Sequence, residues 1–595
     1  MATMSNRRLE PVAVTRRSKW SASASMSASR NRRFSFHFST ESKMKKIYYW
    51  FLSACLLLST TSCEDYLERF PLEGPADQSY FANASELELA VNGCYKGMNF
   101  HPSDGMPTQL LLDVCTDINW DRNNSAMQQI GKGSHDSNNG FVRSVWTEAY
   151  KIIGRCNFIL DNMNKLDGKM DPVLYARFQA EARFVRAYMY GYLIELFGGV
   201  PLVTKTLGLA DAQVPKSTKE ECATFVMKEL DEAAKSLPNS YDAKNTGRAT
   251  KGAALATKAR TALYNEKWEV AASAAKAVMD LNINKLHPNF GELFSYKGQT
   301  SSEIIFALQY LKGTLTHSTP QNFLSRNAQG ASNKVPGQTL IDSYECTDGL
   351  SIDKSPLYNP KDPFKNRDPR LDFTVAVPGS NYFNFKFETH KDSVKTINYT
   401  TGARVDNQDA IHAFATYTGY CWRKYTDLTD KDDRSNSEIN IILIRYAEVL
   451  LIYAEAKIEA NQIDQSVYDA INAVRQRVNM PAIKSGKTQA ELRSIIRKER
   501  KYELANEGFR LFDIRRWKIA DKLLNGNFLG RIPKGLLAAA PVIDANGTPD
   551  YSNVPNKADM RVVEVRIFNP NRDYLWPIPY IETVTNKVLT QNAGY

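Results

Sequence analysis

The segment AEARFVRAYMYGYLIELFGGVPLVT, residues 180–204, is the most informative part of this 595-residue chain for its fold. It belongs to a long helical pattern that runs from Pro172 to Phe197. Two glycines follow Phe197 and close the helix, and Pro201 prevents its continuation. The segment therefore predicts one long helix that ends in a sharp turn.

Similar helical patterns flank this segment and cover residues 86–98, 142–164, 217–237 and 491–524. The third pattern has Thr218 near its start and Glu221 three residues later, which is the spacing of a capping box. Its apolar residues then recur on one face of the helix. The chain is thus predicted to be mainly helical.

Two further stretches have the pattern of paired helices. Residues 249–281 are rich in alanine and are interrupted at 265–268, and residues 444–461 are followed by another helical pattern at 466–478. Small residues at spacings of three and four let two helices approach closely. Each pair resembles a tetratricopeptide unit, although the full repeat consensus is not met.

Residues 282–440 have a different character, because Gly, Asn, Pro and Asp are frequent and the helical period is weak. Aromatic residues gather there in two clusters: Tyr382, Phe383, Phe385 and Phe387, then Phe414, Tyr417, Tyr420, Trp422 and Tyr425. Long irregular segments on a helical scaffold often carry binding residues. We therefore expect the ligand-facing part of the molecule in this region.

The N-terminal region has the layout of an export signal. Two lysines precede an uncharged apolar run at 47–58, and small residues then lead to Cys63. The run is shorter than the roughly 20 apolar residues that span a bilayer. We predict a signal peptide at 44–62 and acylation of Cys63, which would anchor the chain in a membrane.

Two features depart from the usual lipoprotein pattern. Thr60 stands where leucine is common, and Cys55 fits the pattern better locally, although it lies inside the apolar run. Residues 1–43 precede the signal and are rich in Arg and Ser, which also suits an organellar transit peptide. The simpler interpretation is that translation starts at Met44 and that residues 1–43 are an upstream extension.

The net charge of +11 comes mostly from the segment before Cys63. Residues 1–62 hold eleven Lys and Arg and two acids, which leaves 65 basic and 63 acidic residues, a net charge of +2, in 63–595. A nearly neutral mature chain gives no support to nucleic-acid binding. We therefore predict no nucleic-acid partner.

The motifs of common enzyme and metal sites are missing. The cysteines form no C-x-x-C pair, the seven histidines form no H-E-x-x-H, and no G-x-S-x-G occurs. The sequence SGKT at 485–488 lacks the first glycine of a phosphate loop, because Pro481 stands there. We predict no catalytic residue, no metal and no cofactor. One or two disulfides remain open for an exported chain.

The segment at 497–517 is dense in charge, and its Glu499 and Glu503 lie four residues apart. A catalytic carboxylate pair is one interpretation, and an ion-pair lattice that holds two helices together is the favoured one. The sequence RDPRL at 367–371 is likewise predicted to be a structural turn, with Pro369 restricting the backbone and Arg370 pairing locally.

Six stretches, taken in order, resemble the SusD/RagB family of Bacteroidetes outer-membrane lipoproteins. They are CEDYL (63–67), the segment 180–204, FKNRDPRL (364–371), RYAEVLLIYAEA (445–456), RKERKYELANEGFRLFDIRRW (497–517) and YLWPIP…LTQNAGY (574–595). The resemblance covers essentially all of 63–595, which we divide into an N-terminal region, 63–300, and a C-terminal region, 301–595. The acids after Cys63 resemble the signal that sends such lipoproteins to the cell surface.

This resemblance implies an all-α fold in which about four tetratricopeptide-like helix pairs support a looped, ligand-facing half. It also implies a lipid-anchored protein of the outer membrane, facing the cell surface. Such a protein captures an oligosaccharide or polysaccharide and passes it to a SusC-like TonB-dependent transporter, without catalysing a reaction.

The predicted ligand contacts are loop residues that combine aromatic rings with polar groups. An aromatic ring stacks on the apolar face of a sugar, and polar side chains bind its hydroxyls. The residues are Asp117, Asn119, Trp120 and Asn123 from the loop DVCTDINWDRNNS (113–125), and Tyr382, Tyr417 and Trp422 from the irregular region. Packing in the core is an equal alternative for Trp120 and the favoured one for the other three aromatics.

Three other functions stay open from the sequence. Relatives similar to RagB handle peptides, and a near-neutral charge does not separate peptide from glycan. Glycoside hydrolysis is a third hypothesis, since its paired acids need not be close in sequence. A scaffold that binds only proteins is also compatible with tetratricopeptide-like pairs.

Overall fold

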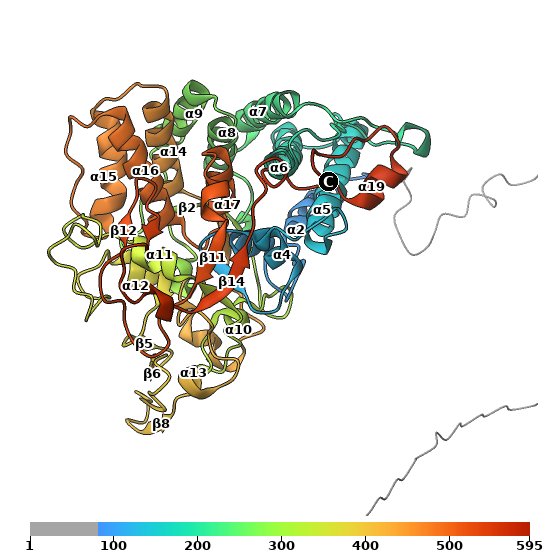
Figure 1. Cartoon of the computed structure of the whole chain (residues 1–595). Coiled ribbons are helices and arrows are strands. Elements are labelled where there is room, and N and C mark those ends of the chain that lie inside the picture. The colour runs from blue at the N-terminus through green and yellow to red at the C-terminus, as the bar shows by residue number, and fades with distance from the viewer. Residues whose placement is uncertain (1–80) are drawn as a thin grey trace, which may run out of the picture. The chain divides into compact units, whose positions relative to one another are not determined.

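The computed structural model describes residues 81–595 (Figure 1). The predicted upstream extension (1–43), the signal peptide (44–62) and the acylation site Cys63 lie outside the described residues. Between residues 81 and 595, no helix is both long enough and apolar enough to cross a membrane.

Long helices carry most of the regular structure, and they occur where the sequence predicts them. They are α2 (Ala84–Met98), α5 (Gly140–Asn162), α6 (Pro172–Phe197), α7 (Lys219–Ser236), α8 (Lys251–Tyr264), α9 (Trp268–Asp280), α14 (Tyr446–Glu459), α15 (Gln465–Arg477) and α16 (Gln489–Leu504). The all-α prediction is confirmed.

Shorter helices lie mainly between and after the long ones. They are α3 (Thr108–Leu111), α4 (Ala126–Lys132), α10 (Thr319–Phe323), α11 (Gln338–Ser343), α12 (Arg370–Thr374), α13 (Gln408–Ile411), α17 (Arg510–Arg516), α18 (Ala520–Leu523) and α19 (Tyr580–Thr585). Helix α17 begins after a break in the charged segment 497–517, so the predicted helix at 491–524 is three helices rather than one.

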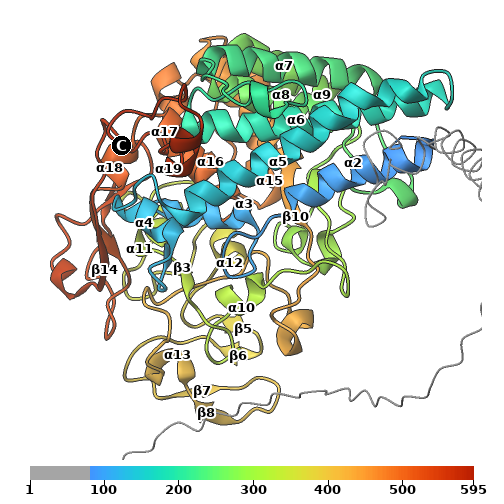
Figure 2. The same ribbon diagram turned by 90° about the vertical axis from the view of Figure 1, so that its right-hand side faces the viewer.

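The long helices pack in a row that follows the chain. Helix α5 contacts α6, and the contacts continue through α7, α8, α9 and α14 to α15 and α16. Figures 1 and 2 show this row on one side of the described unit, with α13 and the β7–β8 hairpin on the other. This arrangement of successive helix pairs confirms the tetratricopeptide-like prediction.

Helix α6 shows why the opening segment predicts its own structure. Asp171 caps its N-terminus by accepting a hydrogen bond from Leu174 N at 2.7 Å, and Pro172 occupies the first turn. Gly198 ends the helix at a φ of 74°. A Cβ on Gly198 would lie 2.9 Å from Leu575 Cδ1, so the turn is also a close contact with the C-terminal segment.

Local capping and buried ion pairs fix neighbouring helices. Thr218 and Glu221 form the predicted capping box at the start of α7. Arg186 on α6 donates to Glu229 on α7 at 3.1 Å through its Nε. Charged hydrogen bonds of this kind are stronger than neutral ones and also restrict the geometry of the helix pair.

The strands are short and form seven two-stranded antiparallel ribbons among residues 81–595. The pairs are β1 (Asn119–Asp121) with β3 (Lys334–Pro336), β2 (Ile304–Leu308) with β10 (Ile441–Arg445), β4 (Val375–Ala376) with β9 (Cys421–Trp422), β5 (Asn381–Tyr382) with β6 (Phe385–Lys386), β7 (Lys395–Ile397) with β8 (Arg404–Asp406), β11 (Gly526–Leu529) with β14 (Val562–Arg566), and β12 (Val542–Ile543) with β13 (Pro549–Asp550). Several ribbons join segments that are far apart in sequence, and β1–β3 is the one that positions the candidate site.

One large hydrophobic cluster runs from Phe81 to Leu589 and takes side chains from both sides of residue 300. The N-terminal and C-terminal regions therefore share a core, and the described residues, 81–595, belong to one compact unit. All six cysteines of the described residues are buried free thiols. The disulfides that the sequence leaves open do not occur among them.

Candidate functional site

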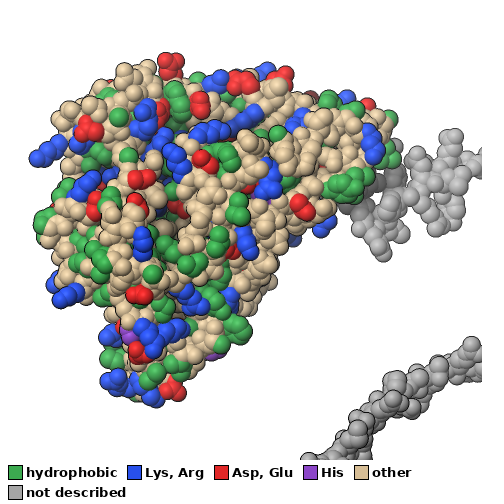
Figure 3. All heavy atoms as spheres, viewed as in Figure 1, with side chains coloured by type: hydrophobic (Ala, Val, Ile, Leu, Met, Phe, Trp, Pro, Cys, Tyr) green, Lys and Arg blue, Asp and Glu red, His purple; other side chains and the backbone are tan. Residues whose placement is uncertain are grey.

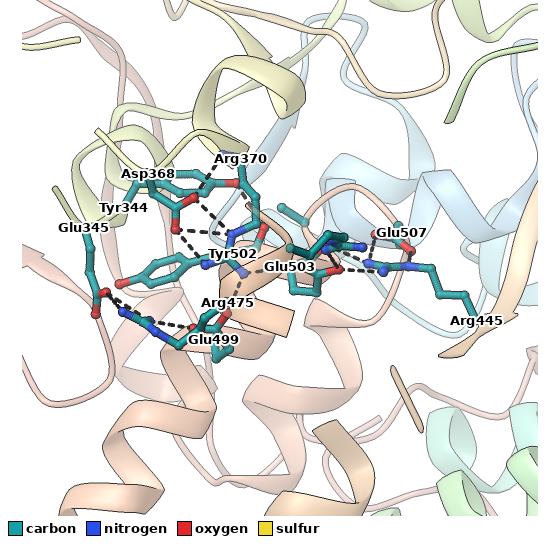
Figure 4. Close-up of polar contacts among 12 residues, drawn as sticks. Tyr344, Glu345, Asp368, Arg370, Arg445, Arg475, Glu499, Tyr502, Glu503 and Glu507 are labelled. Carbon is teal, nitrogen blue, oxygen red and sulfur yellow. Dashed lines mark hydrogen bonds and ion pairs between the residues drawn. The ribbon is translucent and has the colours of Figure 1, made fainter. Parts of the chain in front are cut away.

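The charged segment 497–517 forms a buried network of ion pairs (Figure 4). Arg445 contacts Glu503 at 2.6 Å and Glu507 at 2.7 Å. Arg370 contacts Glu499 at 2.5 Å and Glu503 at 3.2 Å. These side chains and their ion-pair partners are buried, with no side chain more than 3% exposed. We call the set the buried lattice: Glu303, Asp368, Arg370, Lys424, Arg445, Arg475, Arg477, Glu499, Glu503 and Glu507.

The electrostatics of the buried lattice favour structure over catalysis. Burial alone would raise the pKa of the Glu503 carboxyl, but the charges of Arg477, Arg445 and Arg370 outweigh burial and hold the pKa well below its usual range. A carboxylate bound by three guanidinium groups neither takes up a proton readily nor reaches a substrate. The ion-pair interpretation of this segment, with Arg370 at a structural turn, is confirmed.

Gly508 brings two distant backbone segments together next to the lattice. Its φ is 78°, and a Cβ there would lie 2.1 Å from the carbonyl oxygen of Gln109. Its N–H donates to Asp113 Oδ2 at 3.1 Å. Burial raises the pKa of the Asp113 carboxyl to about 7, against the opposing hydrogen bond from Gly508.

Four of the seven predicted ligand contacts are part of the core. Asp117 forms a two-point ion pair with Arg510, with both hydrogen bonds at 2.8 Å. Asn119 has no exposed surface, and its Oδ1 accepts a hydrogen bond from Trp422 Nε1 at 3.2 Å. Trp422 is itself fully buried, and the hydroxyl of Tyr382, which is 1% exposed, donates to its carbonyl at 2.6 Å. We therefore assign these four residues to packing and remove them from the candidate surface.

Trp120 and Tyr417 lie at the boundary between core and surface. Trp120 pairs with Val335 across the β1–β3 ribbon and is 5% exposed. The ring of Tyr417 covers it, with ring centres 5.5 Å apart. Tyr417 is half-buried and Asn123 is exposed. Of the predicted contacts, Tyr417 and Asn123 keep a face that a ligand can reach, with Trp120 supporting Tyr417 from below.

Tyr417 belongs to a surface patch to which five separate chain segments contribute. We call it the Phe414 patch, and it consists of Arg122, Asn123, Arg326, Lys391, His412, Phe414, Tyr417 and Arg561. The segments follow β1, α10, β6 and α13, and the fifth immediately precedes β14. On the face drawn in Figure 3, basic side chains lie beside exposed hydrophobic ones in the lower part, where Figure 1 places α13.

Aromatic rings and cations are interleaved in the Phe414 patch. Phe414 is 54% exposed, and the guanidinium of Arg122 lies 5.1 Å from its ring centre. Arg122 Nη1 also donates to the carbonyl of Phe414 at 2.7 Å, which fixes the arginine against the ring. Arg561 lies 4.2 Å from the ring centre of Tyr417. The patch therefore offers apolar ring faces next to groups that donate hydrogen bonds.

Only some residues of the Phe414 patch lie in segments that the sequence analysis had selected. Arg122 and Asn123 lie in the predicted loop, and Phe414 and Tyr417 lie in the predicted aromatic cluster. Arg326, Lys391 and Arg561 were missed, because no local pattern distinguishes them from other basic residues. Among the described residues, no group of three or more His, Cys, Asp or Glu could hold a metal ion.

Comparison with known proteins shows that two protein-family models match this chain. A sequence model of the SusD family matches residues 302–595, and a second model, described as starch-binding and associating with the outer membrane, matches residues 87–263. A curated relative, SusD-like protein P2 of Formosa agariphila, is 27% identical and spans 93% of this chain and all of its own length.

Solved structures give the same result. A SusD-like carbohydrate-binding protein from Bacteroides fragilis is 32% identical, covers 86% of this chain and 100% of its own, and superposes with a TM-score of 0.74. A second SusD-like protein from the same species is 25% identical, covers 89% of this chain and 100% of its own, and gives a TM-score of 0.71.

Proposed function

Because the chain belongs to the SusD family, we propose that it captures a glycan on the Phe414 patch and delivers it to a SusC-like TonB-dependent transporter. In this proposal Cys63 is acylated and holds the protein at the outer membrane, facing the cell surface. The protein binds and hands over its ligand and catalyses no reaction.

The observation that carries the proposal is the exposed ring of Phe414 beside the half-buried Tyr417 and polar loop groups. Phe414 offers a ring face for the C–H side of a sugar, the half-buried Tyr417 lies beside it under Arg561, and Asn123 and Arg122 can bind hydroxyls at the sugar's edge. The relative from Bacteroides fragilis that is 32% identical is described as carbohydrate-binding, which supports the same ligand class here.

One of the carboxylates that adjoin the patch in sequence, Asp121, shapes its loop instead of facing a ligand. Asp121 is fully buried and forms an ion pair with Lys334 at 3.2 Å. Its Oδ1 accepts the N–H of Asn123 at 3.0 Å, so it shapes the loop. A glycosidase needs two carboxyl groups that face one sugar, and this residue faces its own loop instead.

The first test is calorimetric titration of the purified protein against a panel of neutral and charged polysaccharides, with Phe414→Ala and Tyr417→Ala beside the wild type. We expect saturable binding that each variant weakens by about tenfold, the loss of one stacking contact. Tyr580→Ala is the matched control, since Tyr580 on α19 is 56% exposed and lies away from the patch (Figure 1).

Two results would contradict glycan capture at this patch. One is a panel without any binding, which would move the assignment to peptide ligands. The other is a glycan that binds the two patch variants and the wild type equally. Steady release of reducing ends by the purified protein would contradict the absence of catalysis.

The anchor and the transporter partner are tested in cells. We expect wild-type protein to fractionate with the outer membrane and to co-purify with a TonB-dependent barrel. Cys63→Ser should release the chain from the membrane fraction while its fold and glycan affinity are kept. A Cys63→Ser protein that remains in the membrane fraction without the barrel would contradict lipid anchoring at this residue.

A further inference from the structure

We propose that the glycan bound by the Phe414 patch is anionic, with carboxylate or sulfate groups that meet the cations of the patch. This inference rests on the proposed function and names the ligand class of the same site. It comes from four cations: Arg122 and Arg561 lie against the rings of Phe414 and Tyr417, and Arg326 and Lys391 contact His412 and Ala410 on the same loop.

None of these four side chains forms an ion pair with a carboxylate of the described residues. Arg122 binds the carbonyl of Phe414, and Lys391 binds the carbonyl of Ala410 at 2.7 Å. Arg326 binds the carbonyl of Gly330 at 2.8 Å. Backbone carbonyls orient these three cations, and the charge of Asp121, which is paired with Lys334, only partly offsets that of Arg122.

The cations also act on one another. Burial and then the charge of Arg326 lower the pKa of Arg122. The imidazole of His412 lies between them, with its Nε2 3.1 Å from Arg326 Nη2, and its pKa is lowered by burial and then by both arginines. The pKa of Lys391 is lowered by burial and then by Arg561. The positive charges therefore repel each other, and a bound anion would relieve that repulsion.

Carboxylates near the patch are already engaged elsewhere. Asp409 is buried and accepts the backbone N–H of Arg326 at 2.6 Å. Asp392 forms an ion pair with Lys534 at 2.8 Å, and Asp121 forms one with Lys334. These groups hold the loops in place but leave the outward guanidinium groups free.

The free donors suit anions that present two oxygen atoms side by side. Arg122 uses Nη1 for the carbonyl of Phe414, which leaves Nη2 and Nε for a ligand, and no described residue binds the guanidinium N–H groups of Arg561. A guanidinium matches a carboxylate or sulfate with two parallel hydrogen bonds. Since Phe414 and Tyr417 lie directly against these groups, one sugar could stack on a ring while its acid group meets an arginine.

Matched polysaccharide pairs test the inference. We would titrate the full-length protein with polygalacturonate and its carboxyl-reduced form, and with κ-carrageenan and its desulfated form. We expect the charged member of at least one pair to bind about tenfold more tightly or better, the effect of one charge-assisted contact. The difference should shrink when salt rises from about 0.05 M to about 0.3 M, because salt screens exposed charges.

Variants then test which residues produce the preference for the charged polysaccharide. Arg122→Gln and Arg561→Gln should each lower affinity for the charged polysaccharide by about tenfold and leave affinity for its neutral form unchanged. The matched control is Arg155→Gln on α5, because Arg155 also binds one backbone carbonyl, that of Gly93 at 3.2 Å, but lies on the helical side of the unit. It should change neither affinity.

The outcomes separate this inference from the proposed function. Equal binding of both members of each pair, without salt dependence, would overturn the anionic ligand and leave glycan capture standing. Failure of every glycan, charged or neutral, would overturn both. Preference within only one pair would support the inference and identify the acid group as carboxylate or as sulfate.

Discussion

The buried lattice and the Phe414 patch are both rich in arginine, but they differ in whether the arginines form ion pairs. In the lattice, Arg370 and Arg445 are fully buried, and each contacts at least two carboxylates. In the patch, Arg122 and Arg561 are half-buried and contact aromatic rings and a carbonyl. A buried cation without partners is strongly destabilising, whereas an arginine at the surface stays solvated. Paired charge therefore belongs to the fold, and unpaired charge is available to a ligand.

The largest expected loss of stability follows from a substitution in the buried lattice. Glu503→Gln leaves Arg370, Arg445 and Arg477 short of a shared carboxylate in a buried region, so stability should fall by about 3–5 kcal/mol. Urea unfolding followed by tryptophan fluorescence measures the change. Asp280→Asn, which removes an exposed ion pair with Lys276 on α9, is the control and should leave stability nearly unchanged. An unfolding midpoint like that of the wild type would show that the lattice is not what holds these segments.

The next effect depends on pH and concerns Asp113, beside the lattice. Its folded pKa of about 7 lies above the ordinary value near 3.8, so its charge destabilises the fold increasingly between pH 4 and 7 and fully above 7. Asp113→Asn keeps an oxygen for the Gly508 N–H and removes the charge. The variant should gain stability over the wild type as pH rises across this window, by a few kcal/mol at most.

Asp117→Asn should change the stability of the fold in the opposite direction to Asp113→Asn. Burial alone would raise the pKa of Asp117, but its ion pair with Arg510 outweighs burial and lowers the pKa. Its ionised form therefore stabilises the fold above about pH 4, and the variant should be less stable than the wild type at pH 7. Melting temperatures of both variants at pH 5 and pH 8 measure the contrast. Parallel shifts in the two would contradict the assigned charge states.

The smallest expected stability change is in the patch. Arg561→Gln breaks no ion pair of the described residues and reduces repulsion with Lys391, so its melting temperature should match or slightly exceed that of the wild type. The change in free energy of unfolding should stay within about 0.5 kcal/mol. The same variant should bind a charged glycan more weakly. A clear loss of stability would place Arg561 with the structural charges.

Much of the helical half was predictable from local patterns. The start of α6 at Pro172, its end at Phe197, the capping box of α7 and the break between α8 and α9 depend on residues that are close in sequence. The role of Glu499 and Glu503 was also predicted, because alternating charges at helical spacing favour ion pairs.

The candidate site was predicted less well. Tyr382 and Trp422 were named as loop aromatics with core packing as the favoured alternative, and the structure places both in the core. Trp422 pairs with Val375 in the β4–β9 ribbon and donates to Asn119, and the hydroxyl of Tyr382 donates to the carbonyl of Trp422. Aromatic side chains have large apolar surfaces, so the same residue types serve the core and a sugar-binding surface. Composition alone cannot separate the two uses.

The sequence by itself determined where most of the long helices lie, that they form successive pairs, and that the charged segment 497–517 would form ion pairs. These properties depend on capping, periodicity and glycine or proline, which act over a few residues. Only the tertiary structure decided which aromatic rings reach the surface and which cations lack partners. Arg122, Arg326, Lys391 and Arg561 span more than four hundred residues of sequence, and their shared environment exists only after five loops have packed against one another.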